Sequence, residues 1–182
     1  KGFYPLMCSI FGMIGPHFKD LDGIFSRELA HRGPDDKGTF LDSTFLLALG
    51  HTRLSILDLS MQAHQPMYDK SGRFCLVFNG EIYNYLDLKK ELEGLGHNFF
   101  SNSDTEVVLK SYIVWGRSCV KRFRGMFALC IYDKHKEELF LARDRFGIKP
   151  LIYNFSNSNS FVFTSELKPI LKSKLWKKKL CK

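Results

Sequence analysis

Short apolar runs, each about the length of one or two β-strands, recur along this chain and limit the folds that it can adopt. They cover residues 8–14, 44–57, 74–78, 126–132, 138–142, 151–155 and 160–164. Gly50 and His51 divide the second run, and Asn79-Gly80 follows the third as a dipeptide suited to a tight hairpin turn. Such strands, separated by polar turns, predict antiparallel pairing.

Three segments between these strands have the spacing of helices. An apolar face over residues 20–31 predicts one helix, and a second begins after Tyr83 and ends at a glycine. Ser103 and Glu106 have the spacing of a capping box, which opens a third helix. Helices that flank many antiparallel strands predict an α+β layered domain.

The distribution of charge separates the body of the chain from its end. The chain has 182 residues, enough for one domain with a sizeable core, and a formal net charge of +8. Six lysines lie within residues 172–182 with no acid among them, and subtracting six from +8 leaves +2 for residues 1–171. A near-neutral body argues against a broad phosphate-binding face, so we expect no nucleic-acid partner. Nucleic-acid binding through the lysine-rich tail is the alternative that this leaves open.

The cysteines and the hydropathy indicate the compartment. The five cysteines are odd in number, widely spaced and without a CxxC pair, which indicates neither a disulfide framework nor a zinc site. No apolar run approaches the roughly 18 residues that a membrane helix needs. We therefore expect a cytoplasmic protein with no membrane partner.

Seven short segments, in a fixed order, carry a resemblance to one family. They are Cys8-Ser9-Ile10-Phe11-Gly12, Arg32-Gly33-Pro34-Asp35, Arg53-Leu54-Ser55-Ile56, Asn79-Gly80-Glu81-Ile82-Tyr83-Asn84, Ser103-Asp104-Thr105-Glu106, Arg143-Asp144-Arg145-Phe146-Gly147-Ile148-Lys149-Pro150 and Ser165-Glu166-Leu167-Lys168. Together they resemble the class II glutamine amidotransferase domain of asparagine synthetases. The resemblance implies the N-terminal nucleophile (Ntn) hydrolase fold, a four-layer αββα sandwich of two antiparallel sheets between helices.

The resemblance also implies how the chain is divided. Residues 8–171 form the amidotransferase domain, residues 1–7 are an extension that is an artefact or is removed, and residues 172–182 are a basic tail or truncated linker to a synthetase domain. In this family the nucleophilic cysteine is the mature N-terminus, and its own α-amine, with a free pKa of about 8, is the general base. The simplest hypothesis is that translation begins at Met7 and that an aminopeptidase then removes it.

The same resemblance assigns roles around the side-chain amide of glutamine. Cys8 is the nucleophile, and the Asn79 amide and the Gly80 N–H form the oxyanion hole. Arg53 suits the α-carboxylate of glutamine, and Glu81 and Asp104 suit its α-ammonium. Backbone groups of the segment after Arg53 complete the pocket. The implied substrate-binding set is Arg53, Leu54, Ser55, Ile56, Leu57, Glu81 and Asp104.

The residues alone leave structural alternatives open for each of these roles. Cys8 could be a buried apolar residue, Asn79-Gly80 a plain hairpin turn, and Arg53 a charge on a strand surface. Glu81 could be a turn residue, and Asp104 an acid that favours a helix start.

Other residues that match the family are assigned no catalytic role. His51 and His64 are interpreted as structural hydrogen-bonding residues, because no Cys-His-Asn or Ser-His-Asp signature is present. Residues near the expected interface with a second domain are assigned structural or coupling roles: Arg143, Asp144, Lys149, Ser165 and Glu166. Ser9 stands where the family usually has glycine, so its side chain either crowds the substrate or alters the start of the strand.

The implied reaction is hydrolysis of glutamine to glutamate and ammonia through a Cys8 thioester. The ammonia would serve ATP-dependent asparagine synthesis from aspartate by a synthetase domain that is not in this chain, in cis or in trans. No cofactor or metal is expected here, and ATP and Mg²⁺ belong only to that missing domain. A homodimer of the full-length enzyme is a further expectation. Another acceptor, such as a sugar or peptide, and a catalytically inactive binding or scaffold domain are the alternatives.

Overall fold

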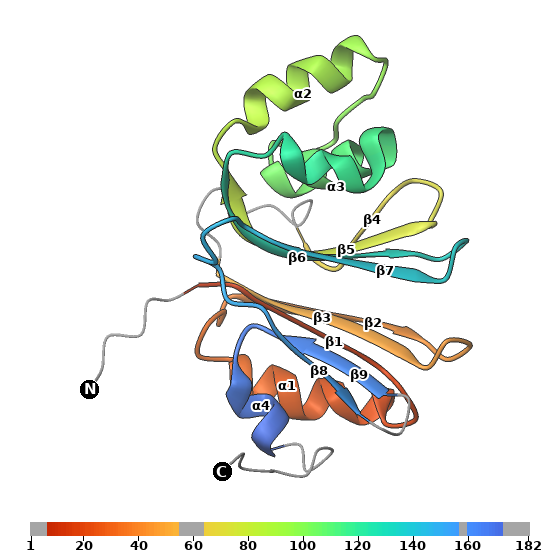
Figure 1. Ribbon diagram of the computed structural model, residues 1–182, viewed down its shortest axis with the longest axis vertical. Coiled ribbons are helices and arrows are strands. Elements are labelled where there is room, and N and C mark those ends of the chain that lie inside the picture. Colours follow the sequence, from red (N-terminus) through yellow and green to blue (C-terminus); the bar gives the residue numbers. More distant parts are fainter. Residues whose placement is uncertain (1–6, 55–63, 157–159, 173–182) are drawn as a thin grey trace.

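Two antiparallel β-sheets lie face to face, and helices cover the outer side of each (Figure 1). The computed structural model describes residues 7–54, 64–156 and 160–172. This arrangement is the four-layer αββα order that the resemblance implies. In the described part of the chain, no helix is long and apolar enough to cross a membrane.

The five-stranded sheet has the strand order β2-β3-β1-β9-β8. Its strands are β1 (Ser9–Ile14), β2 (Asp36–Asp42), β3 (Leu47–Arg53), β8 (Ile152–Ser156) and β9 (Ser160–Thr164). Two helices lie on its outer side, α1 (Leu21–Leu29), preceded by the 3-10 helix η1 (Phe18–Asp20), and α4 (Leu167–Lys172).

The four-stranded sheet has the order β4-β5-β6-β7. Its strands are β4 (Met67–Tyr68), β5 (Phe74–Ile82), β6 (Gly125–Asp133) and β7 (Glu138–Arg143). On its outer side lie α2 (Tyr85–Gly94) and α3 (Asp104–Trp115), and the 3-10 helix η3 (Gly116–Lys121) follows α3.

Both sheets carry apolar side chains on both faces, because each is covered by the other sheet on one side and by helices on the other. In β1, Ile10 joins the cluster between the two sheets, whereas its neighbour Phe11 packs against Phe25 of α1. In β5, Val77 faces the other sheet and Phe78 faces the cluster with α2 and α3. Side chains alternate along a strand, so strands covered twice become nearly continuous apolar runs.

The glycine stop predicted for α2 and the serine cap predicted for α3 both form. Gly96, at φ 88°, and His97 donate their N–H groups to the carbonyls of Glu93 and Leu92, which closes α2 with a Schellman motif. At the start of α3, Ser103 Oγ accepts the N–H of Glu106 at 3.4 Å.

The second half of the capping box does not form. The Glu106 carboxylate accepts the N–H groups of Phe100 and Ser101, at 3.0 and 2.8 Å, and not that of Ser103. It therefore fixes the loop before α3 as well as the start of the helix.

Two interruptions of strands that the sequence indicated are absent from the structure. Asn79-Gly80 is not a hairpin turn, because β5 continues to Ile82 and these two residues pair with Ala128 and Phe127 of β6. Glycine is required at position 80 by close packing, since an added Cβ would lie 2.4 Å from the Met126 carbonyl oxygen. The long-range pairing with β6 overrides the local signal of the dipeptide.

The interruption expected at Gly50 and His51 is also absent, because β3 runs through both residues. An added Cβ at Gly50 would lie 2.0 Å from Cζ of Phe11, so this glycine makes room for a buried ring. Three observed elements, β2, β4 and α4, do not appear among the sequence predictions; β2 is mostly half-exposed and polar, and β4 has only two residues.

Gly50→Ala should destabilise the five-stranded sheet, because the added methyl would force the fully buried Phe11 ring to shift. We expect a loss of about 1–3 kcal/mol in the free energy of unfolding, measured by urea titration. Gly94→Ala is the matched control, since an added Cβ there meets nothing within 4 Å. Equal stability of Gly50→Ala and the unmodified chain would contradict this account.

Candidate active site

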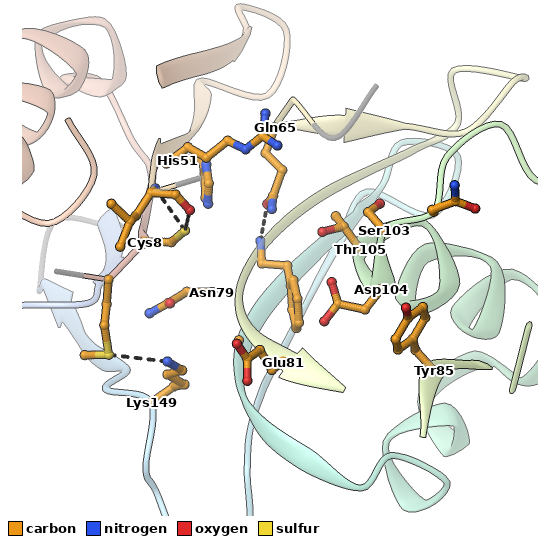
Figure 2. A pocket seen from close by; sticks show the side chains of 16 residues that line it. Cys8, His51, Gln65, Asn79, Glu81, Tyr85, Ser103, Asp104, Thr105 and Lys149 are labelled. Carbon is orange, nitrogen blue, oxygen red and sulfur yellow. Dashed lines mark hydrogen bonds between the residues drawn. The ribbon is translucent and has the colours of Figure 1, made fainter. Parts of the chain in front are cut away.

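A cavity lies where the apolar layer between the two sheets ends, and polar side chains line it (Figure 2). Ile10, Leu49 and Val77 face the inter-sheet layer from β1, β3 and β5. Two residues away along each strand the chain places Cys8, His51 and Asn79, which by the period of two face the same side. Arg53 and Glu81 follow two residues further along β3 and β5. The site is the polar continuation of the inter-sheet core.

The Cys8 thiol is half-buried and held against the chain that leaves β3. The N–H of Leu54 donates to Cys8 Sγ at 3.3 Å, and Sγ lies 3.5 Å from the Leu54 carbonyl oxygen. Burial raises the pKa of the Cys8 thiol above its ordinary value, although the Leu54 backbone and the charges of Lys149 and Arg53 oppose this. A base must therefore take the thiol proton before Cys8 can act as a nucleophile.

Neither His51, which lines the cavity, nor His64 is suited to be that base. Burial, followed by the charge of Arg53, lowers the pKa of His51 to about 3, so the ring is neutral at physiological pH. Its Nε2 is buried and has no hydrogen-bond partner within the described ranges. His64 instead binds Asp36, with Nδ1 2.6 Å from Oδ2, in the structural role predicted for it.

The edge of β5 that faces away from β6 presents backbone donors to the cavity. The Phe78 N–H donates to Gln65 Oε1 at 2.6 Å, and the Ile82 N–H donates to Asp104 Oδ2 at 3.0 Å. In an antiparallel ladder, alternate residues direct their N–H groups to the same edge. The N–H of Gly80, which lies between these two and lines the same cavity, therefore points to it as well.

The side chain of Asn79 is a second donor at this position. It is almost fully buried, and its Nδ2 lacks a hydrogen-bond partner among the residues that the structure describes. A buried amide without a partner is costly, so such a group indicates a site where a ligand oxygen is bound. Asn79 and Gly80 thus present a side-chain donor and a backbone donor next to each other.

Two carboxyl groups lie across the cavity from Cys8 (Figure 2). Asp104 is the first residue of α3, and Glu81 is on β5. Burial, with a smaller contribution from the charge of Glu81, raises the pKa of Asp104 to about 6, although the N–H groups of Ile82 and Thr105 oppose the rise. Arg53, on the inner face of β3, supplies a cation to the same cavity.

The cavity brings together seven of the ten residues that the resemblance assigns to catalysis or substrate binding. They are Cys8, Arg53, Leu54, Asn79, Gly80, Glu81 and Asp104. Ser55, Ile56 and Leu57 lie outside the described residues. In the part of the chain that is described, no group of three or more His, Cys, Asp or Glu side chains could hold a metal ion.

The sequence matches the family model described as "Glutamine amidotransferase domain" over residues 7–182. The chain belongs to this family of glutamine amidotransferase domains.

Its relatives include longer proteins named as asparagine synthetases. The putative asparagine synthetase (glutamine-hydrolyzing) 2 of Methanocaldococcus jannaschii is 43% identical over 192 residues, which cover 95% of this chain and 36% of the relative. The asparagine synthetase (glutamine-hydrolyzing) 3 of Bacillus subtilis is 44% identical over 145 residues, covering 79% of this chain and 23% of the relative. The chain thus spans about a third or less of the length of these relatives.

A solved structure confirms the fold of this amidotransferase domain. Glutamine phosphoribosylpyrophosphate amidotransferase from B. subtilis is similar with a TM-score of 0.76 at 22% identity, over 90% of this chain and 43% of that chain. The predicted α+β Ntn hydrolase sandwich is therefore confirmed, as is the predicted family.

Ser9 does not crowd the cavity of this amidotransferase domain. Its Oγ lies 2.6 Å from Thr52 Oγ1, and both residues are fully buried. Ser9 is one residue from Cys8 on β1, so its side chain points to the opposite face of the sheet, where Thr52 Oγ1 also contacts the Leu29 carbonyl at 3.5 Å. The expectation of crowding is wrong.

Sequence reasoning missed Lys149 as a site residue. It was expected near an interface with a second domain, but its side chain is buried and lines the cavity with Cys8. Its Nζ donates to Met7 Sδ at 3.3 Å. The Arg-Asp run that precedes it in the sequence indicates a loop but not where the loop folds back.

An outer group of polar contacts holds the backbone of the nucleophile. Arg32 Nε donates to the Cys8 carbonyl at 3.3 Å, and Arg32 Nη1 donates to Glu166 Oε1 at 3.0 Å. Ser165 Oγ accepts the N–H of Ile10 at 2.9 Å. Ser165 and Glu166, which follow β9, therefore fix the start of β1.

The Asp104→Asn variant should become more stable relative to the unmodified domain as the pH rises. Because the pKa of Asp104 is raised to about 6, the buried carboxyl favours folding while protonated and loses that contribution as pH passes through 6. The asparagine keeps an acceptor for the Ile82 N–H without the charge. We expect its stability relative to the unmodified domain to rise by up to about 2 kcal/mol between pH 4 and pH 7 in urea titrations.

The exposed Asp87, in the first turn of α2, provides the control. Asp87→Asn should show no comparable change with pH. If Asp104→Asn differs from the unmodified domain by the same amount at both pH values, the raised pKa of Asp104 is refuted.

Proposed function

We propose that this domain hydrolyses glutamine to glutamate and ammonia through a thioester on Cys8. The observation that carries the proposal is the grouping of a thiol, two oxyanion donors and oppositely charged side chains around one cavity. Membership of the glutamine amidotransferase family supports glutamine as the substrate.

The reaction requires a base, and the α-amine of Cys8 is suited to supply it after Met7 is removed. A neutral α-amine takes the thiol proton, and the thiolate sulfur attacks the amide carbon of glutamine. Asn79 Nδ2 and the Gly80 N–H stabilise the tetrahedral oxyanion. The protonated amine then donates its proton to the departing nitrogen, the C–N bond breaks, and ammonia leaves a glutamyl thioester.

The second half of the reaction uses the same groups. The neutral amine takes a proton from water as the water oxygen attacks the thioester carbon, and the same donors bind the second oxyanion. The C–S bond breaks, the thiolate regains the proton from the amine, and glutamate is released. No external oxidant, metal or cofactor is required for either half.

The ends of free glutamine match the charges around the cavity. Arg53 can bind the α-carboxylate with two parallel N–H groups, and Glu81 and Asp104 can bind the α-ammonium. The backbone of Leu54, together with Ser55 to Leu57, is proposed to complete the pocket. Asp104 at the first position of α3 has its backbone fixed by the helix start, which favours a defined carboxylate position.

The acceptor of the ammonia belongs to a larger protein. The asparagine synthetase names of the relatives favour a synthetase domain, in cis or in trans, that uses ATP and Mg²⁺ to make asparagine from aspartate. In this view residues 8–171 are the amidotransferase domain, and residues 172–182 are a basic tail or a truncated linker to that partner. A cytoplasmic location and a homodimer of the full-length enzyme are parts of the same proposal.

A free α-amine on Cys8 should be required for activity. Ammonia and glutamate release from glutamine would be measured for two forms of the chain, one beginning at Lys1 and one beginning at Cys8. We expect release from the second form alone, and Cys8→Ala in that form should abolish it. Folded but inactive protein in both forms would instead select a binding or scaffold domain.

Asn79 and Arg53 should affect different kinetic constants. Asn79→Ala removes an oxyanion donor and should lower kcat roughly 100-fold or more with little change in KM. Arg53→Met removes the carboxylate contact and should mainly raise KM. A steady-state comparison in which both variants change only KM would contradict the roles assigned to them.

A further inference from the structure

Lys149 is a buried cation for which the described contacts provide only a poor partner. Its side chain is 7% exposed, and its Nζ donates to the thioether sulfur of Met7 at 3.3 Å. Thioether sulfur is a weak hydrogen-bond acceptor, so this contact offsets little of the cost of burying an ammonium group. The cost indicates that the charge is retained for the chemistry of the cavity that it lines.

The loop that carries Lys149 is fixed by its own sequence. Arg143 Nε donates to the Lys149 carbonyl at 2.7 Å, and Asp144 Oδ2 accepts the Lys149 N–H at 2.9 Å. Asp144 Oδ2 also accepts the N–H of Phe127 at 3.2 Å, which ties the loop to β6. The Lys149 backbone is thus held on both sides and attached to a central strand of its sheet.

The position of the ammonium relative to Met7 is informative. Met7 is bonded to the nitrogen of Cys8, and that nitrogen becomes the α-amine when Met7 is absent. Figure 2 shows Lys149 on the same side of the cavity as Cys8, below it in this view and away from the side chains of His51 and Gln65. The two groups that must exchange a proton, the amine and the thiol, therefore belong to the residue next to the Lys149 contact.

A cation at this position favours the deprotonated form of both groups, the amine and the thiol. It disfavours a proton on a nearby amine by repulsion, and it favours a thiolate by attraction. The charge of Lys149 does lower the pKa of the Cys8 thiol, and burial lowers the pKa of Lys149 while Glu81 and Cys8 raise it.

The other charged and titratable groups near Cys8 have separate partners or roles. Arg32 and Arg53 are also cations, of which Arg32 pairs with Glu166. Glu81 and Asp104 are the acids of the cavity, and His51 is neutral. Lys149 is the cation whose described contact would disappear when Met7 is removed.

We propose that Lys149 is a positioning residue for proton transfer: its ammonium, carried on a fixed backbone, keeps the α-amine of Cys8 unprotonated and favours the Cys8 thiolate. This inference rests on the proposed glutaminase function. Lys149 forms and breaks no covalent bond; it changes how much of the Cys8 amine–thiol pair is in the reactive state at neutral pH. Arg143 and Asp144 contribute indirectly, by holding the Lys149 backbone.

The test uses the form of the chain that begins at Cys8. Lys149→Met removes the charge at similar length, Lys149→Arg keeps it, and Lys134→Met removes an exposed lysine from the β6–β7 turn as the matched control. Two quantities are followed across the range in which amines and thiols titrate. They are kcat/KM for glutamine and the rate of Cys8 alkylation by iodoacetamide, located by peptide mass spectrometry.

We expect the pH midpoints of both profiles to rise by about one unit in Lys149→Met, as for loss of one nearby charge. Activity near neutral pH should fall roughly tenfold and recover at high pH. Lys149→Arg and Lys134→Met should keep the original midpoints. An unchanged midpoint in Lys149→Met, or an activity loss that persists at high pH, would overturn the proposal.

Two further points separate this proposal from failure of the protein or of the proposed function. Circular dichroism checks that each variant is folded, and Lys149→Gln provides a second neutral side chain if the methionine variant does not fold. If no form hydrolyses glutamine, the proposed function fails. The alkylation midpoint then still decides whether Lys149 controls Cys8: a rise supports the coupling, and an unchanged value overturns it.

Discussion

Side chains alternate between the two faces of a β-strand, and in this domain that alternation decides which residues can meet. Ile10, Leu49 and Val77 fill the layer between the sheets, so the strand positions two residues away must face the same layer. Those positions carry Cys8 and Asn79 at the end of the layer, where water can enter. A slip of one residue in the pairing of β1 would turn Cys8 toward α1 and bring Ser9 into the cavity. The apolar packing between the sheets therefore fixes the register of β1, and the register decides that Cys8 faces the cavity.

The polar end of this layer contains groups that are costly to bury. Asn79 Nδ2 and His51 Nε2 are buried without partners in the described structure, and Asp104 is buried enough for its pKa to rise to about 6. In most protein interiors such buried polar groups have a hydrogen-bond or ion-pair partner. Such costs persist at sites where a ligand compensates them, and the surrounding sheets supply the stability that offsets them. The proposed substrate would supply partners for two of these groups, the Asn79 amide and the Asp104 carboxyl.

The sequence predicted most of the strands and helices because their signals are local or periodic. The glycine stop of α2 and the Ser103 cap of α3 depend on a few neighbouring residues. The turn at Asn79-Gly80 was wrong for the converse reason, since pairing with β6, more than 40 residues further along the chain, decides the conformation there.

The residues of the site also divide into those that the sequence could place and those that it could not. The resemblance placed Cys8, Arg53, Asn79, Gly80, Glu81 and Asp104 together, and the structure gathers them around one cavity. Lys149 could not be placed by spacing, because its contact with Met7 spans 142 residues and depends on how a loop after β7 folds back. Crowding by Ser9, one of the two alternatives considered, is wrong because adjacent residues of a strand face opposite sides of the sheet. Both errors concern three-dimensional position and not residue chemistry.

The proposed mechanism makes conflicting demands on the cations of the cavity, and these demands explain why more than one is needed. Arg53 and Lys149 both lower the pKa of the Cys8 thiol. If Arg53 binds the α-carboxylate of glutamine, the substrate neutralises much of its field at the moment when the thiol must lose its proton. A second cation that does not bind the substrate's carboxylate retains its effect on Cys8 throughout the reaction. Lys149, held from both sides by Arg143 and Asp144 and bound to neither carboxylate of the cavity through a described hydrogen bond, meets that requirement.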